Sequence, residues 1–215
     1  MALSKIQAES INLADTFAFT GTVSGAGDIQ KFSSSTTTQT GLTTLQISLP
    51  TTDDFHELLL KFRALKCESA TNNFWGCTLG DASGNPIQSG YKYIGQYTYS
   101  NGSSSGVSYT QSTTGGVYGR LSAHYPGDGS DDTEFTDIEI SLKFSNKSDR
   151  YTRIFARTGF EKRHTDAYIT YNHVAIIRNA AEVNANINIF VTAGVAFTSY
   201  GYGLYKVMSW QNINY

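Results

Sequence analysis

Apolar and polar residues alternate most regularly between positions 135 and 144. From 137 to 144 every odd position is polar and every even position is apolar. Successive side chains of a β-strand point to opposite faces, whereas a helix would scatter the apolar residues around its circumference. The pattern predicts a half-buried strand whose core residues are Ile138, Ile140, Leu142 and Phe144. The polar residues of the other face, expected in solvent or in a subunit contact, are Asp137, Glu139 and Lys143.

Weaker versions of this alternation recur through the chain. Between residues 55 and 65 helix formers are frequent, so a helix competes with a strand there, but the polar residues fall two apart and favour the strand. Residues 101–106 are expected to form a Gly/Ser hairpin loop. About ten short strands, spaced by about 10–15 residues, predict an all-β fold. The expected architecture is a jelly-roll-like antiparallel β-sandwich with an extended N-terminal arm.

The first 35 residues differ from the rest of the chain. Their apolar residues are widely spaced, residues 21–27 contain three glycines, and residues 33–40 are mostly Ser and Thr. Such a segment has too little apolar content to fold alone. We expect residues 1–35 to form an extended arm, or an edge strand with a linker, and residues 36–215 to form the β-sandwich domain.

Composition narrows the functional classes. The chain has 215 residues, of which 40% are hydrophobic and 16% charged, and its formal net charge is −2. Proteins that bind nucleic-acid phosphates usually carry a basic excess, so we expect no nucleic-acid partner. No apolar run approaches the about 18 residues of a transmembrane helix, so no membrane insertion is expected. The first residues lack the apolar core of a secretion signal, which predicts synthesis in a cytoplasm without export by that route.

The sequence contains no nucleophile elbow, zinc-protease motif, phosphate-binding loop or dinucleotide fingerprint. We therefore expect no enzymatic activity and no cofactor. A glycosidase would need two carboxylates at a defined separation across a cleft. The carboxylates considered for that role are Glu134, Asp137, Glu139 and Glu161.

Three further groups have an ordinary structural interpretation and a chemical one. Cys67 and Cys77 are expected to be small buried side chains, with a disulfide as the alternative. His173 shares a strand face with apolar residues and is expected to be a hydrogen-bonded core histidine. The loop at 126–134 is expected to be an exposed turn, with calcium binding through its carboxylates as the alternative. Its candidate ligands are Asp128, Asp131 and Asp132.

Residues 91–99 carry an unusual tyrosine pattern. All four tyrosines stand at odd positions, so they share one strand face. Tyrosines are enriched at subunit interfaces, and aromatic faces can also cover a sheet within one subunit or stack on sugar rings. Subunit contact, sheet packing and glycan contact all remain open for Tyr91, Tyr93, Tyr97 and Tyr99.

Both ends of the chain resemble one family. Residues 1–23, MALSKIQAESINLADTFAFTGTV, are similar to the opening of many marine bacteriophage virion proteins of the cyanophage and pelagiphage type, labelled tail-fibre-like or head-decoration proteins. Residues 186–189 and 203–207 resemble the closing strands of such proteins. The resemblance implies a non-enzymatic virion structural protein on the exterior of the phage particle, synthesised in the host cytoplasm. It would be an outward-facing capsid decoration or a tail or fibre component.

The same resemblance implies partners and anchoring residues. The N-terminal stretch would attach the subunit to other virion proteins of the capsid or tail. The residues it assigns to this role are Ile11, Leu13, Phe17 and Phe19. Such proteins are usually symmetric homo-oligomers, so a homotrimer is expected. The alternative function is a glycan-binding module that recognises host-surface polysaccharide during adsorption.

Overall fold

The computed structural model describes residues 29–52, 55–68, 74–100, 105–122, 135–162 and 168–208. In these ranges the chain forms β-strands and one 3₁₀ turn, η2 (Thr192–Gly194), so the all-β prediction is confirmed. Two groups of predicted site residues lie outside the described ranges. They are the anchoring residues Ile11, Leu13, Phe17 and Phe19 and the loop residues Asp128, Asp131 and Asp132.

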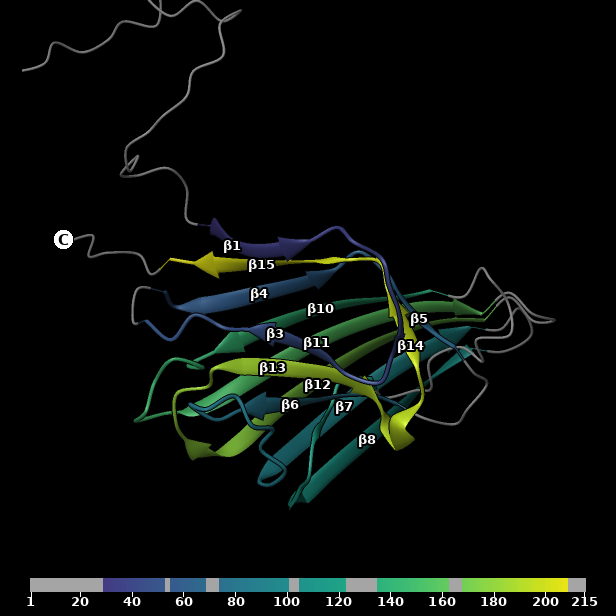
Figure 1. Cartoon of the computed structure of the whole chain (residues 1–215). Helices are drawn as coiled ribbons and strands as arrows, with labels where there is room; N and C mark the ends of the chain where they lie inside the picture. Colours follow the sequence, from purple (N-terminus) through teal and green to yellow (C-terminus); the bar gives the residue numbers. More distant parts are fainter. Residues whose placement is uncertain are drawn as a thin grey trace, which may run out of the picture.

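An eleven-stranded antiparallel sheet forms one layer (Figure 1). Its main path runs in the order β1 (Ile29–Ser35), β15 (Tyr202–Val207), β4 (Glu57–Phe62), β10 (Thr136–Lys143), β11 (Tyr151–Lys162), β12 (Tyr168–Ala181), β7 (Tyr91–Ser100) and β8 (Ser105–Gly116). Three short strands branch from this path, namely β2 (Gln39–Leu42), β5 (Leu65–Cys67) and β14 (Phe197–Ser199).

A four-stranded sheet forms the second layer, and Figure 1 shows it lying over one face of the large sheet. Its order is β3 (Leu45–Ser48), β13 (Asn186–Val191), β6 (Trp75–Gly80) and β9 (Gly119–Arg120). The two layers form a sandwich-like arrangement, as the alternation predicted. The finer jelly-roll assignment stays a prediction.

The core lies between the two sheets and follows directly from side-chain alternation. In β10, Ile138, Ile140 and Leu142 are buried, and the residues between them face the other side of the sheet. From the small sheet, Trp75 packs edge-on against Phe197 with 5.1 Å between ring centroids. Within the described ranges, twenty-six buried apolar side chains form one contiguous cluster.

Two predictions about individual strands are refined. Residues 57–62 and 65–67 are strands, not a helix. Phe144 is not a core residue, because β10 ends at Lys143 and Phe144 takes a left-handed backbone conformation with φ of 63°. The half-buried ring of Phe144 instead packs edge-on against His56, 6.4 Å away, with the Arg150 guanidinium 5.3 Å from its centroid.

The last seven residues of the expected arm belong to the large sheet. Strand β1 pairs antiparallel with β15, from Ile29 opposite Val207 to Ser35 opposite Tyr202. This matches the edge-strand alternative for these residues. The expected loop at 33–40 is shortened accordingly, because β1 continues to Ser35 and β2 begins at Gln39.

Candidate functional site

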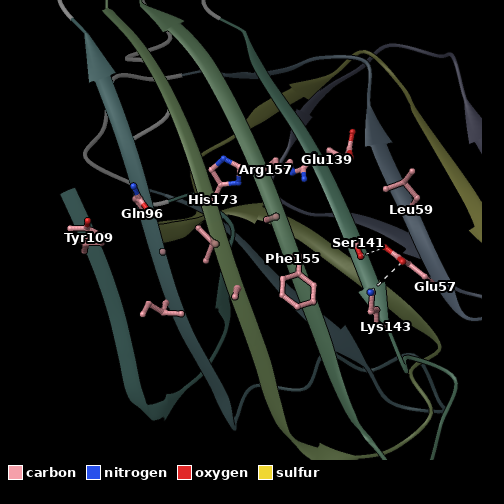
Figure 2. Close-up of a pocket in the computed structure, with 15 residues that line it drawn as sticks. Glu57, Leu59, Gln96, Tyr109, Glu139, Ser141, Lys143, Phe155, Arg157 and His173 are labelled. Carbon is pink, nitrogen blue, oxygen red and sulfur yellow. Dashed lines mark hydrogen bonds and ion pairs between the residues drawn. The ribbon is translucent and has the colours of Figure 1, made fainter. Parts of the chain in front are cut away.

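The face of the large sheet that points away from the small sheet carries a groove of about 640 Å³ (Figure 2). We call this surface the outer face. Side chains reach it from six adjacent strands, β4, β10, β11, β12, β7 and β8. Because these strands pair in register, their outward side chains line up in rows that run across the strands.

The first row is polar and crosses all six strands. Its neighbours are paired in register from one strand to the next. In order they are Lys61, Glu139, Arg157, His173, Gln96 and Tyr109. At about 4.8 Å per strand the row is about 24 Å long. At its end Tyr109 is 72% exposed. The row therefore offers hydrogen-bond donors, hydrogen-bond acceptors and an accessible aromatic ring.

The second row, two residues along each strand, is mainly apolar. Its members are Leu59, Ser141, Phe155, Ala175 and Ile94, again paired in register. Ile94 is 60% exposed and Phe155 is 44% exposed. A second hollow of about 330 Å³ adjoins this row and is lined by both side chains and by Ile177. Large apolar side chains are thus held at the surface by strands that are well packed on their other face.

The third row is charged. Glu57 stands opposite Lys143, which stands opposite Arg153 on the next strand. Lys143 Nζ lies 3.7 Å from a Glu57 carboxylate oxygen, and the Ser141 hydroxyl donates a hydrogen bond to the same carboxylate. In the polar row, Lys61 Nζ lies 3.0 Å from Glu139 Oε2. Over β4, β10 and β11, charged side chains therefore flank the apolar row on both sides, while on β12 the third row continues with Ile177, opposite Arg153.

Two carboxylates, Glu57 and Glu139, line the groove. Glu57 stands opposite Lys143, four residues along β10 from Glu139. At about 3.4 Å per residue their backbones are about 14 Å apart along the strands. Each of these two carboxylates forms an ion pair with a lysine, Glu57 with Lys143 and Glu139 with Lys61. Asp137 and Glu139 both lie on the outer face of β10, and the side chains of Glu134 and Glu161 are outside the described residues.

The tyrosine face of β7 is the inner face. Tyr91 is fully buried, and its hydroxyl accepts a 2.7 Å hydrogen bond from the backbone N–H of Leu79 on the small sheet. Burial raises the pKa of Tyr91. Tyr93 and Tyr97 are half-buried and pack against the core, while the side chain of Tyr99 is outside the described residues. Tyr91 therefore performs sheet packing within the subunit and has no surface to offer a glycan or a second subunit.

Three other predicted residues are placed by the structure. His173 is not a core histidine: it lies exposed on the outer face, because the even residues Val174 and Ile176 of β12 face the core. Cys67 and Cys77 are buried thiols that form no disulfide, and burial raises the pKa of Cys77. Within the described ranges, no group of three His, Cys, Asp or Glu side chains is placed to hold a metal ion.

Sequence reasoning missed the outer-face rows of β11, β12 and β7. The sequence did contain an indication of these rows, because a large apolar residue stands between two polar ones on the same strand face. In β11, Phe155 stands between Arg153 and Arg157, and in β7, Ile94 stands between Lys92 and Gln96. Only the strand register brings these two apolar residues into one row.

A scan against protein-family models and searches of curated proteins and of solved structures found no match to this chain. The part of the chain that the structure describes holds no helix with the length and apolarity needed to cross a bilayer.

Proposed function

We propose that this protein is a non-enzymatic structural component of a phage virion, an outward-facing capsid decoration or a tail or fibre subunit, and that it assembles as a homo-oligomer. The proposal combines the resemblance at the two chain ends with one structural observation. That observation is the apolar row of the outer face, flanked on both sides by charged side chains over β4, β10 and β11. Its partners would be further copies of this chain, in a trimer by the resemblance, and other virion proteins that hold the N-terminal segment.

The pattern of the outer face supports self-association. Specific interfaces bury an apolar centre inside a polar rim, with aromatic residues and arginine enriched. Phe155, Ile94 and Leu59 supply the apolar centre, and Arg153 and Arg157 stand beside it. Contiguous apolar patches rimmed by polar residues mark interaction sites on soluble proteins. Covering this row with a second copy would remove both large apolar side chains from water.

The mass of the purified protein in solution tests the proposal. Light scattering coupled to gel filtration should give an oligomer for the wild type. The double substitution Ile94→Glu/Phe155→Glu should lower that mass, because it places carboxylates in the apolar centre, while the melting temperature stays within a few degrees. The matched control is Val117→Glu, which alters a side chain that is 58% exposed in the turn after β8. An unchanged mass in the double variant refutes the outer face as a subunit contact.

A second candidate function, saccharide binding during host adsorption, is favoured by the polar row. Sugars are bound by hydrogen bonds from planar polar groups and by stacking on aromatic rings, and Arg157, Gln96 and Tyr109 offer both. The double variant Arg157→Ala/Gln96→Ala should lose binding to host-surface polysaccharide while its melting temperature is unchanged. Lys31→Ala, on the exposed part of β1, is the control. A wild-type protein that binds no polysaccharide of its host refutes this candidate and leaves the first one standing.

A further inference from the structure

The two edges of the large sheet differ in how they are protected. Exposed strand edges present unpaired N–H and C=O groups, and proteins usually blunt them with charges, proline, bulges or short strands. Strand β1, at one edge, is seven residues long, carries Lys31 and has a register shift between Lys31 and Ser33. These features are ordinary protective devices against pairing with another chain.

Strand β8, at the other edge, has no such device along most of its length. It is twelve residues long, and its sequence, SGVSYTQSTTGG, contains no charge and no proline. Its ladder with β7 is continuous from Ser105 opposite Ser100 to Ser112 opposite Tyr93, and the register shifts only beyond Ser112, where Gly116 stands opposite Tyr91. Within the described residues, β8 pairs with β7 alone and ends the sheet (Figure 1). Its second edge is therefore a regular pairing template of about 27 Å, at 3.4 Å per residue.

The packing of β8 holds this edge in place. On its inner side, Thr110 Oγ1 accepts a 3.1 Å hydrogen bond from an Arg120 guanidinium nitrogen. The same guanidinium stacks on the Phe74 ring, 3.0 Å from its centroid, and donates a second bond to the Ser122 carbonyl. A rigid edge loses less conformational freedom on pairing than a mobile one.

We infer that β8 pairs with β8 of a second copy, antiparallel and across a twofold axis perpendicular to the sheet. Such an axis keeps the two outer faces on the same side of the joined sheet. One residue of β8 then stands opposite its own copy at the axis, and each residue before it stands opposite the equivalent residue after it. The absence of charge means that no register places like charges opposite each other. With Tyr109 on the axis, its ring meets its own symmetry mate, and Ser108 stands opposite Thr110. Aromatic pairs and Ser–Thr pairs are both favourable across strands.

A second copy fits this edge better than another kind of strand. The strand offers no charge by which a charged peptide would be selected, and it has the even Ser/Thr composition that pairs well with itself. Pairing would join two large sheets into one continuous surface, with both outer faces on the same side. The inference rests on the proposed homo-oligomer but uses a different surface from the apolar row: paired β8 strands would join two trimers into a hexamer. The two contacts are therefore tested by different variants.

A cysteine scan of the full chain tests the pairing. Cys67 and Cys77 are buried, so single cysteines introduced at positions 106 to 113 can be oxidised selectively. Only the residue on the twofold axis has its counterpart within disulfide range, because residues one step away are about 8 Å from their own counterparts and disulfides need less than about 7 Å. We expect one sharp maximum of crosslinked dimer, at Tyr109→Cys. Ser34→Cys, on β1, is the control and should remain uncrosslinked.

Charge substitution gives an independent readout. The variant Tyr109→Lys/Gln111→Lys should halve the mass of the wild-type oligomer, and so should Tyr109→Glu/Gln111→Glu. An equimolar mixture of the two should recover the full mass, since at position 109 a lysine then stands opposite a glutamate and the opposite charges at position 111 lie diagonal to it. Recovery also shows that both variants fold. A flat crosslinking profile, or a mass that both variants leave unchanged, overturns the inference, whether or not Ile94→Glu/Phe155→Glu dissociates the outer-face contact.

Discussion

The Tyr91 hydroxyl provides the sharpest test of how the tyrosines of β7 are used. Tyr91→Phe removes one oxygen and leaves the shape of the ring unchanged. That oxygen accepts the backbone N–H of Leu79, and both residues are fully buried. The substitution therefore leaves a buried donor without its acceptor, which costs about 1–3 kcal/mol. Truncation to alanine would add the loss of a buried ring, about 3–5 kcal/mol for a large aromatic side chain.

Melting followed by circular dichroism measures the effect. For a domain of this size a loss of 1 kcal/mol lowers the melting temperature by about 2–4 °C, so Tyr91→Phe should melt several degrees below the wild type. Urea unfolding should give the same loss in free energy with an unchanged slope, because the area exposed on unfolding does not change.

Tyr109→Phe is the matched control, since Tyr109 is 72% exposed on the neighbouring strand. An exposed hydroxyl of this kind should alter stability by less than about 0.5 kcal/mol. If Tyr91→Phe is as stable as Tyr109→Phe, the hydroxyl does not hold the two sheets together. The assignment of the tyrosine face to the interior would then lose its main support.

Two further predictions concern pH and the N-terminal segment. Burial raises the pKa of Cys77 from 9.0 and the pKa of Tyr91 from 10.0. Because the unfolded chain loses these protons at lower pH than the folded chain, the contribution of both groups to stability is full below about pH 9 and falls above it. The loss is up to about 1.4 kcal/mol per pH unit for each group. Urea unfolding between pH 7 and 10.5 should show the free energy of unfolding falling as pH rises. Cys77→Ala should make this fall with pH less steep, and an equally steep fall in wild type and variant would contradict the prediction. Deletion of residues 1–28, which retains β1, should abolish incorporation into virions while the melting temperature is kept; incorporation by the deleted protein would refute the role of Ile11, Leu13, Phe17 and Phe19.

The sequence predicted the fold well where one strand face is apolar and the other polar. Strand β10 is the clearest case, because Ile138, Ile140 and Leu142 face the core as expected. Phe144 continues the same alternation but lies beyond the strand end, where a backbone reversal with positive φ turns its ring outward. Periodicity specifies which residues share a face, and it does not specify where pairing stops.

The same limit explains the tyrosines and His173. Alternation placed the tyrosines of 91–99 on one face, which is correct for those whose side chains are described, but a strand pattern does not say which face is inside when both carry large residues. In β7 the other face carries Ile94 among Lys92 and Gln96. In β12 the face with His173 carries Ile177, and the buried face is the one with Val174 and Ile176. The choice is made by packing against the small sheet.

Strand β8 shows a different limit, and it bears on function. Its residues are Ser, Thr, Gly and Gln with only two larger side chains, Val107 and Tyr109, so no apolar alternation marks it as a strand. It forms because β7 beside it is fixed by Tyr91 and by pairing with β12. A strand selected only for its own stability at a sheet edge would gain from a charged side chain such as Lys31 of β1. The small polar, uncharged composition that kept the sequence from predicting β8 is therefore also the property that suits β8 to pair with a second copy.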